Sequence, residues 1–161
     1  MIRPVNPSDA ESITRIYNHY ILDTTVTFET EALEVSEMAE RIKSISAHHP
    51  YFVYEEDGKV IGYCYAHPWK ERAAYSHTWE VTIYLDANAT RHHAGTALMT
   101  HLIDTCKKTD CHALIACITQ ENEASVTFHE KMGFKKASHF VKVGRKFNRW
   151  LDVTDLELLL E

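Results

Sequence analysis

The segment between residues 79 and 118 constrains the fold most strongly, because its pattern is typical of a strand, a helix and a second strand in succession. Apolar and polar side chains alternate over residues 79–85, and this period of two predicts a strand with one buried face. Helical spacing of apolar residues over about 95–108 predicts a helix, and residues 113–118 form a short, continuous apolar run typical of a strand covered on both faces. This order favours a parallel crossover within a mixed α/β fold.

Outside this unit, the sequence predicts two N-terminal helices, a hairpin, one more helix and a final strand. The hairpin is predicted over residues 51–55 and 59–66, because the Asp57-Gly58 pair between two apolar runs is a strong turn signal. Pro7-Ser8-Asp9 offers a candidate N-cap for the first helix, and apolar spacing places the second around residues 38–45. The later helix is expected from Asn122 to Gly133, and the last strand over about 150–160.

Length and charge exclude several classes of protein. The 161 residues contain no repeat or linker, so we expect a single domain over residues 1–161. With 17 Lys and Arg against 23 Asp and Glu, the chain lacks the basic excess that a nucleic-acid binder needs to neutralise phosphates. It also lacks an apolar run typical of a signal peptide or a membrane span. We therefore expect no membrane association and a cytoplasmic location.

Cysteine and histidine content bears on redox state and on metals. The four cysteines include no C-x-x-C pair, and Cys64 and Cys117 lie in apolar runs where buried free thiols are expected. Eleven histidines raise metal binding as a hypothesis. However, the adjacent His92 and His93 rarely face one ion together, and the sequence has no H-E-x-x-H motif or Cys/His ligand spacing. We therefore expect no metal site.

The loop that follows the strand at 79–85 is a candidate anion site. It leads into a helix and carries Arg91, His92 and His93 shortly before Gly95. Free backbone N–H groups and the helix dipole make such a place suited to a pyrophosphate. A single glycine before a helix is, by itself, more often only a turn.

This loop resembles the acetyl-CoA loop of the GNAT N-acetyltransferases, whose usual pattern is Gln/Arg-x-x-Gly-x-Gly/Ala before an apolar helix. Thr90 stands for the Gln/Arg, His93 for the first glycine and Gly95 for the last, so two of these three positions depart from the pattern. Blocks elsewhere resemble the phosphinothricin and methionine sulfoximine acetyltransferase branch along essentially the whole chain. In order they are Ile16-Tyr17-Asn18-His19-Tyr20, Phe28-Glu29-Thr30-Glu31, Pro68-Trp69-Lys70-Glu71-Arg72-Ala73-Ala74-Tyr75, Asn122-Glu123-Ala124-Ser125 and Gly144-Arg145-Lys146-Phe147-Asn148-Arg149-Trp150-Leu151-Asp152.

The resemblance implies a fold and an activity. The fold is the GNAT (acyl-CoA N-acyltransferase) fold, an α/β architecture whose mixed, mostly antiparallel central sheet has a parallel, splayed strand pair and is flanked by helices. The activity is direct transfer of acetyl from acetyl-CoA, as co-substrate, to the α-amino group of a small amino acid or analogue, by a homodimer. Two alternatives stay open: a polyamine or protein amine as acceptor, or a degenerate acyl-CoA-binding module.

The chemistry requires a neutral amine, a polarised thioester carbonyl and a proton for the departing thiolate. Glu80 lies on the polar side of the strand at 79–85 and, by the resemblance, matches the proposed catalytic base; otherwise it is a solvated carboxylate or an ion-pair partner. By the same resemblance, His129 would lie near the CoA sulfur, where it would protonate the thiolate or orient the pantetheine arm. Otherwise it is a surface or packing residue of its helix.

The resemblance also implies a set of binding residues. Backbone groups of Ile83, Tyr84 and Leu85 would pair with the pantetheine amides as an added strand does. Asn122 would hydrogen-bond the pantetheine, or else cap its helix. The pyrophosphate would be held by the loop residues Arg91, His92, His93, Ala94, Gly95 and Thr96.

For the acceptor, the resemblance points to two short segments. Arg72 and Tyr75 match one wall of the branch's substrate site, and Phe28 and Glu29 match the other. An arginine beside an aromatic wall is what an amino-acid carboxylate or a phosphinate needs. The alternative is that the arginine lies along the surface and the aromatic side chains pack in the core.

Overall fold

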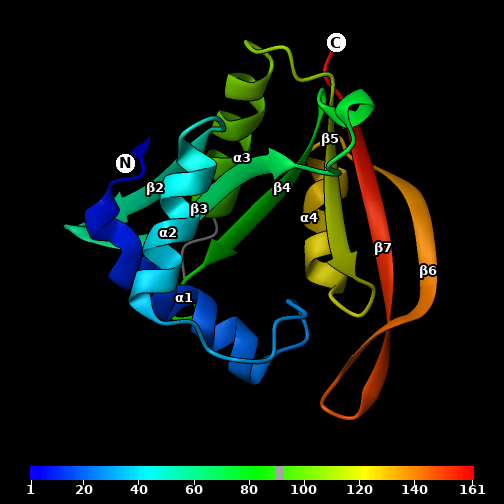
Figure 1. The fold of residues 1–161 in the computed structure, drawn as a ribbon, viewed down its shortest axis with the longest axis horizontal. Coiled ribbons are helices and arrows are strands. Elements are labelled where there is room, and N and C mark those ends of the chain that lie inside the picture. The colour runs from blue at the N-terminus through cyan, green and yellow to red at the C-terminus, as the bar shows by residue number, and fades with distance from the viewer. Residues whose placement is uncertain (90–92) are drawn as a thin grey trace.

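The computed structural model describes residues 1–89 and 93–161, which form one seven-stranded sheet with helices on both faces (Figure 1). The strands are β1 (Ile2–Pro4), β2 (Tyr51–Glu56), β3 (Lys59–Pro68), β4 (Thr78–Leu85), β5 (Ala113–Thr119), β6 (Lys135–Lys146) and β7 (Arg149–Leu159). The helices are α1 (Ala10–Asp23), α2 (Val35–Ser46), α3 (His93–Cys106) and α4 (Glu123–Lys131), with short 3₁₀ turns at Pro7–Asp9 and Ala73–Tyr75. In the described part of the chain, no helix is long and apolar enough to cross a membrane.

The strands follow the order β1-β2-β3-β4-β5-β7-β6, and only β4 and β5 pair in parallel. The predicted hairpin is confirmed: β2 and β3 are joined at Asp57 and Gly58, whose φ angles of 50° and 76° suit a tight two-residue turn. The predicted crossover is confirmed too, since α3 connects β4 to β5. The sheet is therefore mixed and mostly antiparallel, as expected.

Two apolar cores lie on the two faces of the sheet. On one face, α1 and α2 pack through Ile13, Ile16 and Ile42 against side chains of β2 and β3. On the other face, α3 packs through Leu98 and Leu102, and α4 adds Val126 and Phe128. Because side chains alternate along a strand, β4 contributes to both cores. Its residues Val81, Ile83 and Leu85 face α3 and α4, whereas Tyr84 faces α1 and α2.

The parallel pair separates along its length, and this separation positions the site. β4 and β5 pair only at Thr78–Glu80 of β4 and Ala113–Ile115 of β5. Beyond these pairs β4 stays bonded to β3 as far as Leu85, while β5 stays bonded to β7 as far as Thr119. The two strands thus diverge beyond Glu80 and leave a gap in the middle of the sheet (Figure 1).

Two strands, β1 and β6, are absent from the sequence-based prediction. β1 is only three residues long. β6 is an edge strand in which most side chains are exposed on both faces, so its sequence lacks the alternation that marks a half-buried strand. A register irregularity between Phe140 and Gly144 interrupts its pairing with β7, and Lys142 has a φ of 52°.

Candidate active site

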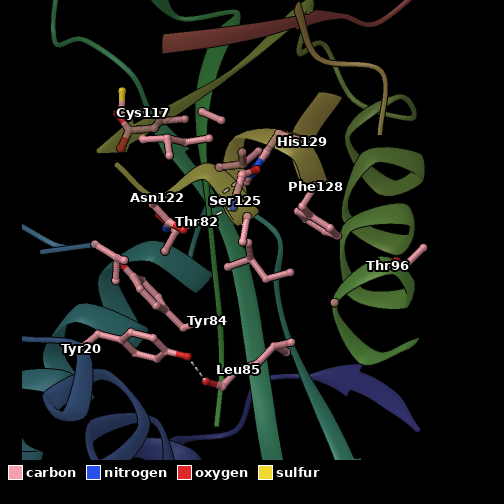
Figure 2. A pocket seen from close by; sticks show the side chains of 18 of the residues that line it. Tyr20, Thr82, Tyr84, Leu85, Thr96, Cys117, Asn122, Ser125, Phe128 and His129 are labelled. Atoms are coloured by element: carbon pink, nitrogen blue, oxygen red, sulfur yellow. Dashed lines mark hydrogen bonds between the residues drawn. The ribbon is translucent and has the colours of Figure 1, made fainter. Parts of the chain in front are cut away.

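The gap between β4 and β5 forms a cavity of about 640 Å³. Both diverging strands, the first turn of α3, the helix α4 and Tyr20 of α1 contribute to its walls (Figure 2). The side chains that line it and carry a polar atom are Tyr20, Glu80, Thr82, Tyr84, Thr96, Cys117, Asn122, Ser125 and His129.

The backbone of β4 presents hydrogen-bonding groups to this gap. The N–H of Asp86 donates to the carbonyl of Ile61 at 2.8 Å, and the N–H of Trp69 donates to the carbonyl of Thr78 at 3.3 Å. In an antiparallel pair, residues that bond to the partner strand alternate with residues whose backbone faces away from it. Because Thr78 and Asp86 bond on the β3 side, the backbone groups of the odd-numbered residues Val81 and Ile83 face the gap.

The three β4 residues expected to bind pantetheine are not equivalent in this geometry. The backbone of Ile83 faces the gap, whereas that of Tyr84 faces β3 and its side chain lines the cavity. The carbonyl of Leu85 accepts a hydrogen bond of 2.5 Å from the hydroxyl of Tyr20 (Figure 2). A ligand that pairs along β4 would therefore meet Val81 and Ile83 first.

Glu80 occupies the point where β4 and β5 part. Its Oε2 lies 3.3 Å from Nε2 of His67, the residue directly opposite on β3. Its Oε1 accepts a hydrogen bond of 3.4 Å from the thiol of Cys117 on β5. The side chain is 26% exposed and lines the cavity, so its carboxylate is accessible to a ligand bound there.

Cys117 lies on the cavity wall, and the prediction that its thiol is buried is wrong, whereas that for Cys64 is confirmed. β4 pairs with β5 only as far as Ile115, and Cys117 lies beyond that point as the one exposed residue of β5. Desolvation by the surrounding protein raises the pKa of the thiol, and the nearby carboxylates of Glu80 and Asp155 raise it further. Cys117 is therefore a protonated thiol at neutral pH and serves as a hydrogen-bond donor.

His129 is buried, with 4% of its surface exposed, in the last turn of α4. Its Nδ1 lies 2.8 Å from the carbonyl of Ser125, and because a carbonyl can only accept, Nδ1 carries the proton. Phe128 and Phe134 pack edge-on around the ring, and desolvation lowers the pKa of the imidazole although the Ser125 carbonyl opposes this shift. The ring is thus neutral at neutral pH, with Nε2 as an acceptor.

Asn122 performs one of its two expected roles. Its Oδ1 accepts a 3.3 Å hydrogen bond from the N–H of Ser125, which caps α4. The residue also lines the cavity, and the cap uses only the carbonyl side of its amide. The amide nitrogen remains a donor group on the same side chain, so capping and ligand binding are compatible.

The first turn of α3 supplies part of the expected pyrophosphate loop. Within it, Gly95 and Thr96 line the cavity, whereas His93 is exposed and Ala94 is buried in the core. A Cβ at Gly95 would lie 3.4 Å from Cδ1 of Leu85, which is ordinary van der Waals contact. The expected contributions of Arg91 and His92, and the departure at Thr90, lie outside the described residues.

Phe28 and Glu29 do not occur among the described residues that line the cavity. The Glu29 carboxylate forms a bidentate ion pair with Arg41, at 2.6 and 2.9 Å, and also accepts a hydrogen bond from Tyr17. Phe28 lies against the hairpin of β6 and β7, where a Cβ on Gly144 would come within 2.2 Å of its ring. Both residues therefore fix the loop between α1 and α2 in this structure.

Arg72 and Tyr75 are also absent from the cavity wall in the described part of the chain. Arg72 is exposed and precedes the 3₁₀ turn at Ala73–Tyr75. The ring of Tyr75 packs edge-on against Trp69, with centroids 5.4 Å apart. The structure thus brings Glu80, His129 and the expected CoA-binding elements together, and leaves the four expected acceptor residues outside.

Sequence reasoning missed several residues of the cavity wall. Thr82 lies on the polar side of the alternating strand with Glu80, so that alternation was the available signal for it. Tyr20 occurs in one of the blocks that carry the family resemblance, and Cys117 occurs in an apolar run, but neither pattern predicts a place in the cavity wall. Their positions at the cavity depend on tertiary contacts that no local pattern encodes.

A parallel strand pair that diverges within a mixed, mostly antiparallel sheet is the arrangement expected of the GNAT fold. Residues 2–154 match the family model described as acetyltransferase (GNAT) domain. The chain belongs to the GNAT acetyltransferase family, and it is an N-acetyltransferase by this membership.

Within this family, the chain is similar to enzymes whose names state their substrates. The chain is 34% identical over 152 residues to a phosphinothricin N-acetyltransferase of Streptomyces viridochromogenes, covering 94% of this chain and 83% of the relative. It is 30% identical over 164 residues to the L-methionine sulfoximine/L-methionine sulfone acetyltransferase of Salmonella typhimurium, covering 99% and 94%. A crystal structure of a phosphinothricin acetyltransferase from Sinorhizobium meliloti in complex with acetyl-CoA superposes with a TM-score of 0.95 at 33% identity, covering 99% of this chain and 88% of that chain.

The histidines of the described residues are not grouped into a metal centre. Within residues 1–89 and 93–161, no group of three or more His, Cys, Asp and Glu side chains is placed to hold a metal ion. Several histidines instead pair with single carboxylates, as His139 does with Asp152 at 2.8 Å.

Proposed function

We propose that this chain transfers acetyl from acetyl-CoA to the α-amino group of a small amino acid or amino-acid analogue. The position of Glu80 carries the proposal, because its accessible carboxylate lies at the apex of the cavity, where a base is needed. The names of the relatives from Streptomyces and Salmonella support an acceptor of the phosphinothricin, methionine sulfoximine or methionine sulfone type.

The cavity fits acetyl-CoA in its backbone chemistry and its size. Val81 and Ile83 present amide groups that suit the amides of a pantetheine arm, and Asn122 adds a side-chain donor. The start of α3 presents free N–H groups suited to a pyrophosphate. When bound, acetyl-CoA supplies an acetyl group activated as a thioester.

Glu80 acts as the general base in this proposal. The ammonium of an amino acid must lose a proton before its nitrogen becomes a nucleophile. Glu80, Thr82 and Tyr84 extend from the same face of β4, which is the face that packs on α1 and α2. The acceptor would therefore approach from this face, opposite the apolar side chains that β4 directs toward α3 and α4.

His129 contributes by orientation rather than by donating a proton in this proposal. With Nδ1 fixed on the Ser125 carbonyl and the ring neutral, its Nε2 accepts a hydrogen bond. Donation from Nε2 to a thiolate would require the buried ring to become charged first, which its desolvation opposes. We assign His129 to holding a donor group of the ligand.

An acceptor comparison tests the function. Purified protein with acetyl-CoA is expected to release free thiol when methionine sulfoximine, methionine sulfone or phosphinothricin is added, with the acetyl group recovered on the α-nitrogen by mass spectrometry. Spermidine and a peptide with a free N-terminus test the alternative acceptors in the same assay. Calorimetric binding of CoA without turnover of any acceptor would instead support a binding module and contradict the proposal.

We propose that the enzyme is a cytoplasmic homodimer. Its four free cysteines suit a reducing compartment. The edge strand β6 and its hairpin expose a row of large apolar side chains, and clustered exposure of this kind marks an interaction surface. The exposed residues are Phe140, Val141, Val143, Phe147 and Trp150.

A charge placed in this row is expected to separate the dimer. Val141 is 66% exposed, so Val141→Glu removes little packing from the monomer, while a dimer interface would have to bury the new carboxylate. Analytical ultracentrifugation should show a dimer for the wild type and a monomer for the variant. Val35→Glu, at an exposed apolar residue on α2, is the control and should leave the dimer intact. A monomeric wild type would contradict the proposal.

A further inference from the structure

The two oxygens of the Glu80 carboxylate have different partners, one from each neighbouring strand. The thiol of Cys117, from β5, donates to Oε1 at 3.4 Å. The imidazole of His67, from β3, lies with Nε2 at 3.3 Å from Oε2. Because His67 and Glu80 are directly opposite residues of the β3–β4 ladder, the register of the sheet fixes this second contact.

Only one of these partners is able to receive a proton from Glu80. The Cys117 thiol keeps its own proton at neutral pH, because desolvation and then the nearby carboxylates raise its pKa. In the neutral tautomer that carries its proton on Nδ1, the Nε2 of an imidazole has a free lone pair and can accept a proton.

His67 also has a route to solvent. Its side chain is 31% exposed, so a proton on the ring can pass to water. A proton on Glu80 would instead face the ligand in the cavity. Its ring lies 5.7 Å from that of Tyr65, and burial followed by the charge of His67 lowers the pKa of the nearby His49. The titratable groups around the pair, in the described part of the chain, are His49 after α2, Tyr65 on β3, Cys117 on β5 and Asp155 on β7.

We propose that His67, in the tautomer that carries its proton on Nδ1, is a proton-relay residue, which takes from Oε2 of Glu80 the proton that Glu80 removes from the acceptor and passes it to solvent. In the first transfer, an N–H bond of the acceptor ammonium breaks and an O–H bond forms on Oε2. In the second, that O–H bond breaks and an N–H bond forms on Nε2 of His67. The imidazolium then releases the proton on Nε2 to water, which restores both groups. This inference rests on the proposed function.

Two substitutions test the relay. In His67→Gln the side-chain amide can donate to Oε2 but is unable to accept a proton, whereas in His67→Ala the side chain can do neither. Both variants are expected to lower kcat by about tenfold, with the KM for acetyl-CoA unchanged and an altered dependence of kcat on pH. Added imidazole should restore kcat of His67→Ala in a concentration-dependent manner, because it replaces the missing relay.

A matched control and the wild type make the outcome decisive. His139→Gln breaks another His–carboxylate pair, His139 with Asp152, outside the cavity wall, and should leave kcat and its pH profile unchanged. If both His67 variants keep the kcat and pH profile of an active wild type, the relay is overturned while the proposed function stands. If the wild type itself acetylates no acceptor, the proposed function has failed, and the relay fails with it. Melting temperatures of all variants show that each is folded.

Discussion

Replacing the proposed base should produce the largest loss of activity in this protein. Glu80→Gln is expected to lower kcat by about 100-fold or more at neutral pH, since general-base catalysis contributes at least this much. The carboxamide keeps the size of the side chain and a carbonyl oxygen for the Cys117 thiol, now 3.4 Å away. What it loses is the ability to take a proton from the acceptor ammonium.

The pattern of kinetic constants identifies the role. Because Glu80 lies on the acceptor face of β4, the substitution should leave the dissociation constant for CoA unchanged by calorimetry. The remaining activity should rise with pH, as solvent deprotonates a growing share of the amine before it binds. Glu55→Gln, at a carboxylate paired with Arg3 at 2.8 Å and outside the cavity wall, should retain wild-type kcat. Wild-type kcat in Glu80→Gln would remove Glu80 from the mechanism.

The elements that the sequence predicted well are those set by local patterns. The hairpin turn at Asp57-Gly58 and the strand–helix–strand unit depend on turn chemistry and periodicity within a few residues, and both occur where expected. β6 was missed because an edge strand exposed on both faces has no buried face to impose an alternation. Its pairing is set by β7, which the strand meets only in the folded sheet.

The site depends on relations that a single segment does not contain. The run around Cys117 predicted a fully covered strand, yet β4 pairs with β5 only as far as Glu80, and Cys117 is exposed beyond that pairing. Glu29 was expected at the acceptor, whereas Arg41, on the next helix, engages its carboxylate. The contact between His67 and Glu80 follows from the strand register, which becomes readable only once β3 and β4 are paired.

Partly filling the cavity from the α3 side should weaken CoA binding without affecting the base. Gly95 lies in the first turn of α3, and a Cβ there would meet Leu85 at 3.4 Å and Phe128 at 3.7 Å. One methyl group therefore fits, but the three further carbons of a leucine must enter the cavity or displace these side chains. Overpacking costs about 1–3 kcal/mol, so Gly95→Leu should weaken CoA binding by about 30-fold.

Gly95→Ala is the matched control that separates cavity size from helix stability. Alanine favours a helix by about 1 kcal/mol over glycine, so this variant should raise the melting temperature and change the dissociation constant for CoA by less than about threefold. Thr100→Leu adds similar bulk at an exposed position of the same helix and should leave CoA binding unchanged. If Gly95→Leu binds CoA as tightly as the wild type in calorimetry, the ligand does not pass between β4 and the start of α3. The assignment of that helix terminus to the pyrophosphate would then be wrong, even with Glu80 established as the base.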